Sequence, residues 1–166
     1  MHLKRIIEES VGDYKETSML LVTPSCTWKC KGCQNKDLAK LPTVEVDDND
    51  ILALFSSNPF SKAIVIGGLE PLDNIEEIRA FIFSARKHFD VGERPPIIIY
   101  TGYEEEQLKK MGWESKLKYE LIQYGNCHLK YGKYIQNGLP YKNAVLGVKL
   151  ASNNQHVFSF TRKQYE

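Results

Sequence analysis

The sequence predicts one α/β domain built on a mainly parallel β-sheet, and three observations lead to this fold class. Apolar runs such as Lys62–Gly68 are continuous rather than alternating, which is typical of strands covered on both faces. Segments with the apolar spacing of helices separate these runs, as the crossovers between parallel strands require. The 166 residues suit one domain but fall short of the about 250 residues of a complete eight-unit α/β barrel, so we expect a partial, open parallel α/β barrel.

Strands and helices alternate along the first two thirds of the chain. The expected strands are short, apolar and bounded by glycine or proline: Ser18–Thr23, Lys62–Gly68 and Pro95–Gly102. The expected helices begin with acidic or polar residues and carry apolar residues at helical spacing: Asp47–Phe55, Asn74–His88 and Glu104–Met111. This order implies right-handed crossovers, which bring the three strand ends to one edge of the sheet.

The periodicity weakens after about Ser115. Further strands are predicted in three apolar stretches: Cys127–Ile135, Ala144–Leu150 and His156–Phe160. We therefore expect a single domain over residues 1–166, with an N-terminal extension (1–16), a core (17–112) and C-terminal strands (115–166).

Composition limits the classes of function. The net charge of +1 gives no overall field that would favour nucleic acid or an anionic membrane. The N-terminus lacks the apolar segment of a signal peptide, and no apolar run approaches the roughly 18 residues of a membrane span. We expect a cytoplasmic protein that binds neither nucleic acid nor membrane. In that reducing compartment, clustered cysteines indicate metal binding or catalysis rather than disulfides.

Three of the four cysteines lie within eight residues, directly after the first strand. They are Cys26, Cys30 and Cys33, in the pattern C-x3-C-x2-C. A structural zinc site needs four ligands, whereas a [4Fe-4S] cluster held by three cysteines leaves one iron open to a small molecule. The fourth cysteine, Cys127, lies far along the chain beside His128, where a plain strand pair is the expected interpretation. A non-catalytic zinc module of three cysteines and a histidine is the alternative.

C-x3-C-x2-C after a first strand resembles the cluster motif of the radical S-adenosylmethionine (SAM) superfamily. The resemblance implies that Cys26, Cys30 and Cys33 hold a [4Fe-4S] cluster whose open iron binds the amino and carboxylate groups of SAM. It implies reductive cleavage of SAM to methionine and a 5′-deoxyadenosyl radical, which abstracts a hydrogen atom from a substrate. Trp28 stands where this superfamily often places an aromatic residue near the adenine.

A second motif follows the second strand. The turn Gly67–Gly68–Leu69–Glu70–Pro71 resembles the superfamily's G-G-E-P turn, which holds the amino group of SAM, although Leu69 interrupts the pattern. The glycines let the backbone approach a ligand, Glu70 adds a charge and Pro71 stiffens the turn. Thr101 and Tyr103 follow the third strand at the same sheet edge, where they are expected to reach the cofactor.

The longer pattern resembles one subgroup, the small activating proteins of anaerobic (class III) ribonucleoside-triphosphate reductase. The segments that carry this resemblance are "CTWKCKGCQN", "GGLEPL", "YTGYEEEQL", "LKYGKYI" and "LASNNQHVF". The sequence departs from the subgroup in three respects: Tyr131 stands where an aspartate is expected, Ala151 replaces a glycine, and the arginine that usually precedes the terminal segment is not evident.

The subgroup resemblance implies a substrate and partners. The radical is expected to pass to a glycine in the large subunit of the anaerobic reductase, and a flavodoxin-type protein is expected to supply electrons. Activation of another glycyl-radical enzyme, or action on a small molecule, remains the alternative within the superfamily. A contact of the Asn153–Gln155 segment with SAM or the reductase stays open beside its interpretation as a polar turn.

Overall fold

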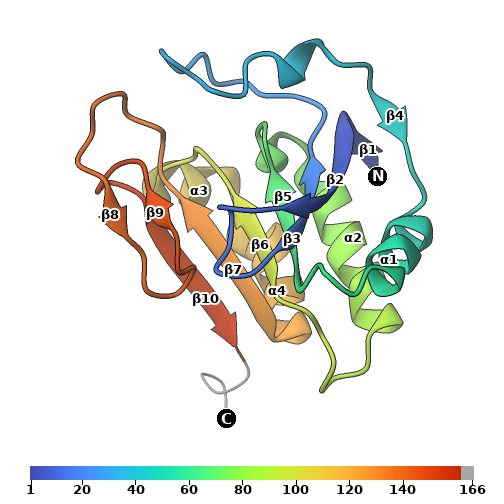
Figure 1. Ribbon diagram of the computed structural model, residues 1–166. Helices are drawn as coiled ribbons and strands as arrows, with labels where there is room; N and C mark the ends of the chain where they lie inside the picture. Colours follow the sequence, from blue (N-terminus) through green and yellow to red (C-terminus); the bar gives the residue numbers. More distant parts are fainter. Residues whose placement is uncertain (162–166) are drawn as a thin grey trace.

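The computed structural model describes residues 1–161 and shows a mixed α/β domain with a mostly parallel central sheet (Figure 1). The sheet has six strands in the order β10-β7-β6-β5-β3-β2. The middle strands β3, β5, β6 and β7 run parallel, and the edge strands β2 and β10 run antiparallel to their neighbours. The bounds of these strands are β2 (Arg5–Ser10), β3 (Ser18–Val22), β5 (Ala63–Gly67), β6 (Ile97–Tyr100), β7 (Asn126–Tyr131) and β10 (His156–Thr161).

The helices pack against one face of the sheet, behind it in Figure 1. They are α1 (Asp48–Ser57), α2 (Ile75–His88), α3 (Glu105–Met111) and α4 (Tyr119–Tyr124), with a π-helical stretch at Glu114–Lys118 and 3-10 turns at Leu38–Lys40 and Pro71–Asn74. The three helices and three strands predicted before residue 112 are confirmed, with ends that differ by at most two residues. None of the helices in the described part of the chain is long and apolar enough to cross a membrane.

The other face of the sheet is covered by two segments that carry little regular structure. The loop between β2 and β3 brings Tyr14 onto this face, and residues 141–150 add Leu146 and Leu150. These side chains pack on Leu20 and Val65 from the strands. Burial on both faces explains why the strands are continuously apolar.

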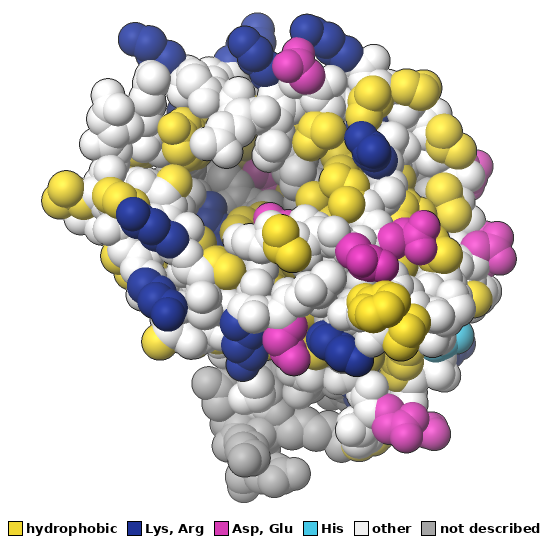
Figure 2. Space-filling view, viewed as in Figure 1, with side chains coloured by type: hydrophobic (Ala, Val, Ile, Leu, Met, Phe, Trp, Pro, Cys, Tyr) yellow, Lys and Arg dark blue, Asp and Glu magenta, His cyan; other side chains and the backbone are white. Residues whose placement is uncertain are grey.

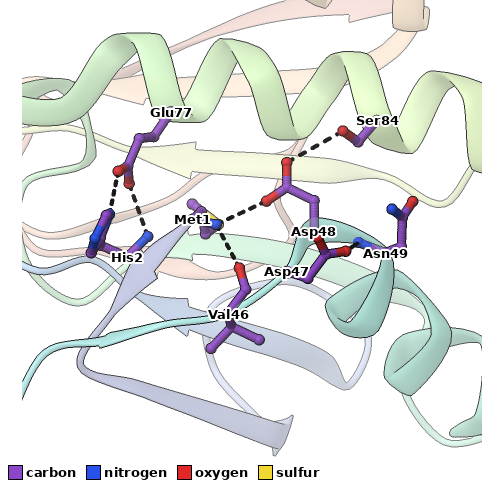
Figure 3. Close-up of polar contacts among 8 residues, drawn as sticks. All are labelled: Met1, His2, Val46, Asp47, Asp48, Asn49, Glu77 and Ser84. Atoms are coloured by element: carbon purple, nitrogen blue, oxygen red, sulfur yellow. Dashed lines mark hydrogen bonds and ion pairs between the residues drawn. The ribbon is translucent and has the colours of Figure 1, made fainter.

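The first residues fasten the far end of the cysteine-bearing loop to the helices (Figure 3). The α-amino group of Met1 donates hydrogen bonds to the Val46 carbonyl at 2.6 Å and to Asp48 Oδ1 at 3.0 Å. Ser84 of α2 donates to the other Asp48 oxygen at 3.3 Å. A two-stranded ladder joins the same segments, β1 (His2–Leu3) with β4 (Val44–Glu45). The loop after β3 is therefore tied down at its return to α1.

Residues 114–124 form helix rather than the strand structure predicted from residue 115 onward. Leu117, Leu121 and Tyr124 recur at spacings of four and three residues and are fully buried on the helix side of the sheet. Because polar residues separate these three, the sequence did not reveal the helical period. Within residues 1–16, the expected N-terminal extension, the chain contributes edge strand β2 to the sheet.

The prediction of a strand over Ala144–Leu150 is mostly wrong. Only its last two residues pair, as β9 (Lys149–Leu150) with β8 (Tyr141–Lys142). Asn143 Oδ1 accepts hydrogen bonds from two backbone N–H groups that follow it, and Gly147 adopts a φ of +70°, so the chain turns instead.

The two other strands predicted after residue 115 have different outcomes. The strand expected over Cys127–Ile135 ends at Tyr131, because Gly132 has a φ of +105°. The strand over His156–Phe160 is confirmed as β10. Residues 162–166 of the predicted C-terminal segment lie outside the described part. The sheet is open, with no strand in residues 1–161 joining β2 to β10, and the partial barrel remains a prediction.

Candidate functional site

The carboxyl ends of the four parallel strands meet at one edge of the sheet and surround a cavity of about 250 Å³. Each strand contributes the residues that directly follow it or end it. This is the edge at which open parallel sheets bind their ligands. Eight of the ten predicted site residues line this cavity: Cys26, Trp28, Cys30, Cys33, Gly67, Gly68, Glu70 and Thr101.

The three cysteines lie on the cavity wall formed by the loop after β3. Cys30 and Cys33 also line a second, adjoining cavity, and the Cys33 N–H donates to the Cys30 carbonyl at 3.2 Å. Partial burial, together with the nearby carboxylates of Glu70 and Asp73, raises the pKa of the Cys26 thiol. A bound cation would oppose this shift and favour the thiolate.

Glu70 joins three turns of the site. Its carboxylate is almost completely buried and accepts four hydrogen bonds. Oε1 accepts from Thr101 Oγ1 at 2.7 Å and from the Leu72 N–H at 3.0 Å. Oε2 accepts from Trp28 Nε1 and from the Gly102 N–H, both at 2.8 Å. Burial raises the pKa of this carboxyl, and the four donors counteract part of that rise.

Asp73 fixes the cysteine loop a second time. Its carboxylate accepts from the Thr27 N–H at 2.9 Å and from the Thr27 hydroxyl at 3.1 Å. It also accepts from the Tyr103 hydroxyl at 3.1 Å. The Tyr103 ring packs edge-on against Trp28, with ring centroids 4.9 Å apart. Tyr103 thus supports the site from outside, since it is not among the residues that line the cavity.

Pro71, the other predicted residue that does not line the cavity, begins the 3-10 turn after Glu70. It is buried, and its ring suits this first helical position because no N–H is needed there. Two glycines nearby are required for geometric reasons. Gly68 has a φ of +77°, and a Cβ on Gly102 would lie 2.9 Å from Trp28 Nε1. Glycine at both positions lets the turns close around Trp28.

Sequence analysis missed a buried lysine in the cavity. Lys130 is the last residue but one of β7 and is 6 % exposed, and its ammonium group donates to the Gly132 carbonyl at 2.9 Å. Burial lowers the pKa of Lys130 to about 8. A lysine inside a predicted strand, Cys127–Ile135, was the available signal. Tyr100, Asp13 and Gln155 also line the cavity and were not predicted there individually.

Tyr100 and the Asn153–Gln155 segment close the cavity through hydrogen bonds. The Tyr100 hydroxyl donates to the Asp13 carbonyl at 2.6 Å, and burial raises the pKa of this phenol. Asn154 donates to the Lys133 carbonyl at 2.9 Å, and Gln155 Nε2 donates to the Gly132 carbonyl at 3.4 Å. The segment is therefore a polar turn, as expected, and only Gln155 of its three residues reaches the cavity wall.

Cys127 and His128 lie in β7 and form an ordinary strand pair. Cys127 is fully buried in the helix-side core, where burial raises the pKa of its thiol. His128 points to the opposite face, where it stacks on Tyr14 and shares a hydrogen bond of 3.0 Å with Ser159. Neither residue lines the cysteine cavity, so the zinc alternative gains no fourth ligand from them.

The donor set suits an iron–sulfur cluster in its chemistry. Three thiols on one loop supply the soft sulfur ligands that such clusters require. Within residues 1–161, no three or more His, Cys, Asp or Glu side chains are already gathered closely enough to hold a metal ion. The loop places all three thiols on one cavity wall, but they are not yet close enough to share a metal ion. Binding of a cluster would have to draw them together.

A mostly parallel α/β domain with three cysteines at its ligand-binding edge defines the chain as a cluster-binding α/β protein. Comparison with known families supports this class, since residues 16–157 match the family described as "4Fe-4S single cluster domain". The chain belongs to this family. Searches of curated proteins and of solved structures found no match.

Proposed function

We propose that this protein is a radical SAM enzyme, and that it acts as an activase which generates a glycyl radical on an anaerobic ribonucleoside-triphosphate reductase. The observation that carries the proposal is the convergence of Cys26, Cys30, Cys33 and the Gly67–Glu70 turn on one cavity. These two motifs lie over 30 residues apart in the sequence, and the parallel topology brings them together. When bound, a reduced [4Fe-4S] cluster would supply the electron that cleaves SAM.

The protein's own residues would position SAM. The Gly68 carbonyl is suited to accept a hydrogen bond from the ammonium of an amino acid, whereas the Gly67 carbonyl already accepts from the N–H and the hydroxyl of Thr23. Trp28 offers an aromatic surface for adenine, and its indole N–H is fixed by Glu70. Lys130 supplies a buried positive charge in the same cavity.

The cavity walls come mainly from the segments that follow the four parallel strands, three of which lead into helices while the segment after β7 leads into β8. An open site of this kind suits a substrate that supplies its own loop, such as a glycine segment of a large protein. Abstraction of hydrogen from that Cα would give 5′-deoxyadenosine and a glycyl radical that is delocalised over the flanking amides.

The test is anaerobic loading with iron and sulfide, followed by reduction and addition of SAM. We expect 5′-deoxyadenosine, and no product from a protein with a complete cluster would refute the radical SAM proposal. Cys26→Ala, Cys30→Ala and Cys33→Ala should each abolish the product, whereas Cys127→Ala should retain both iron and product. A glycyl-radical signal after addition of the reductase large subunit would test the activase role separately.

A further inference from the structure

A short segment beside the cavity has almost no fixed contacts of its own. Tyr134–Pro140 lies between β7 and β8, and none of its residues is buried. In the described part of the chain its one hydrogen bond runs from the Gly138 N–H to the Ile135 carbonyl at 3.1 Å, inside the segment itself. Ile135 and Leu139 are 48 % and 72 % exposed, so burial of apolar surface contributes little to holding the segment in place. We call Tyr134–Pro140 the strap.

The chain is firmly held at both ends of the strap. Before it, the Gly132 N–H donates to the Tyr103 carbonyl at 2.9 Å, and the Lys133 N–H donates to Glu104 Oε1 at 3.0 Å. After it, Tyr141 begins the β8–β9 ladder. A segment with few buried contacts between two fixed ends opens locally, at a free-energy cost well below that of unfolding the domain.

The strap packs against the middle of the cysteine loop. Gly32 lies between Cys30 and Cys33, and a Cβ on it would lie 3.1 Å from the amide group of Gln136. The Gln136 side chain therefore rests directly on the loop. Figure 1 shows the loops after β3 and β7 at the same end of the sheet, and Figure 2 shows a hollow in the surface beside them.

The strap covers two of the three thiols and leaves the third open. Tyr134 lines the main cavity and also the adjoining one, which has a volume of about 200 Å³. Cys30 and Cys33 line both cavities and are half-buried, whereas Cys26 lines only the main cavity and is exposed. Solvent therefore reaches Cys26 more freely than the other two.

A cluster needs all three thiols at once, and a metal site needs an entry path. We propose that the strap is a hinged cover, which moves away from Cys30 and Cys33 to admit a [4Fe-4S] cluster and then closes over it. The inference goes beyond the proposed function, because it rests only on the cluster that the family of this chain implies.

Gly138 shows how closely the closed strap is seated. A Cβ on Gly138 would overlap the Cβ of Ser152 and lie 3.1 Å from the Ile135 carbonyl oxygen. Ser152 is fully buried and donates from its hydroxyl to Asn154 Oδ1 at 2.5 Å, so it cannot easily give way. An alanine at position 138 would therefore force the strap out of its seat without touching the cysteine loop.

The experiment measures how fast each thiol reacts in the cluster-free protein. N-ethylmaleimide is added, and the labelled peptides are quantified by mass spectrometry over time. The first variant, Y134A/Q136A, removes the two strap side chains that lie over the cysteines. The second variant, Gly138→Ala, displaces the strap and keeps both of those side chains.

Each variant has a matched control. Y119A/Q123A makes the same two changes at exposed positions of α4. Gly92→Ala adds a Cβ that meets no atom within 4 Å.

The expected result is selective. Labelling of Cys30 and Cys33 should speed up about threefold or more in both strap variants, and by less than about 1.5-fold in the controls. Cys26 should keep its wild-type rate, because the strap does not cover it. Buried Cys127 should stay unlabelled as long as the domain is folded. Uptake of the cluster, followed by visible absorbance during anaerobic addition of iron and sulfide, should accelerate in the same variants.

Three results would overturn the proposal. Unchanged rates at Cys30 and Cys33 in either strap variant would show that the strap is a static wall. Equal acceleration at Cys26 would locate the change in the cysteine loop. Faster labelling without faster cluster uptake would show that the strap does not control entry.

Two safeguards keep these outcomes distinct. If labelling of Cys127 shows that Y134A/Q136A unfolds, Gln136→Ala alone replaces it, with Gln123→Ala as its control. SAM is absent from every step, so a failure to cleave SAM would count against the proposed function and leave the outcomes for the strap unaffected.

Discussion

The Glu70→Gln substitution tests whether one buried carboxylate holds together the turns at the carboxyl edge of the sheet. The carboxylate accepts from Leu72 and Thr101 on one oxygen and from Trp28 and Gly102 on the other. Glutamine has nearly the same shape but replaces one oxygen with an NH2 group that can only donate. The substitution therefore changes hydrogen bonding with little change in packing.

The two possible orientations of the glutamine differ in cost. An NH2 in place of Oε2 would face the indole N–H of Trp28 and the Gly102 N–H, and neither can accept. An NH2 in place of Oε1 would face the Thr101 hydroxyl, which can turn and accept, and the Leu72 N–H, which cannot. The second orientation leaves one buried donor unpaired, a cost of about 1–3 kcal/mol in unfolding free energy. Glu70→Met leaves all four donors without the carboxylate and should cost at least about 4 kcal/mol.

Urea unfolding of the cluster-free protein, followed by far-UV circular dichroism, measures these changes. Glu105→Gln is the matched control, because Glu105 is about half exposed and pairs with Lys109 on the helix surface. The control should change stability by less than about 0.5 kcal/mol. Hydrogen exchange adds a local readout, since the Leu72 or Gly102 amide should lose protection in Glu70→Gln. Equal stability of Glu70→Gln and the control, with both amides still protected, would show that the four bonds do not organise this edge.

Three further predictions follow from the same geometry. Gly102→Ala places a Cβ 2.9 Å from the Trp28 ring, whereas a Cβ at Gly92 meets no atom within 4 Å. In urea titrations, Gly102→Ala should therefore lower the unfolding free energy by about 1–3 kcal/mol, and Gly92→Ala, the control, should not. Asp73→Asn removes the charged acceptor of the cysteine loop and should speed limited proteolysis within residues 24–43; unchanged cleavage would contradict its anchoring role. Lys130 has its pKa lowered by burial from 10.5 to about 8, so between these values the unfolded chain binds more protons and stability rises with pH. Relative to Lys130→Met, wild type should gain about 2 kcal/mol between about pH 7.5 and 9.5 in urea titrations, and parallel curves for the two proteins would exclude this linkage.

The parallel core was predictable because its signals are local. Continuous apolar runs identify β3, β5 and β6, and well-bounded helical periods identify the three helices between residues 47 and 111. The alternation of strands and helices then determines their topology. The cysteine spacing and the glycine turn are local as well. For that reason, eight predicted residues line the cavity without any knowledge of distant contacts.

The missed features depend on contacts between distant parts of the chain. Strand β2 contains only two apolar residues, Ile6 and Ile7, among charged ones, and it forms because it pairs with β3. Lys130 would be solvated on a bare sheet face. It is buried because turns from both ends of the chain close over that face, and these turns have little periodicity of their own.

The arrangement around Glu70 also changes how the glycine turn is interpreted. The sequence leaves open whether Glu70 or the backbone of the turn contacts the amino group of SAM, and in the structure the four hydrogen bonds to the Glu70 carboxylate come from the protein itself. Under the proposed function, the Gly68 carbonyl is the better acceptor for a ligand ammonium, since Glu70 is already satisfied and the Gly67 carbonyl accepts from Thr23. Glu70 is then a positioning residue. Its loss should reduce the stability of the three turns first, and should weaken SAM binding only as far as Trp28 and the glycine turn lose their fixed places.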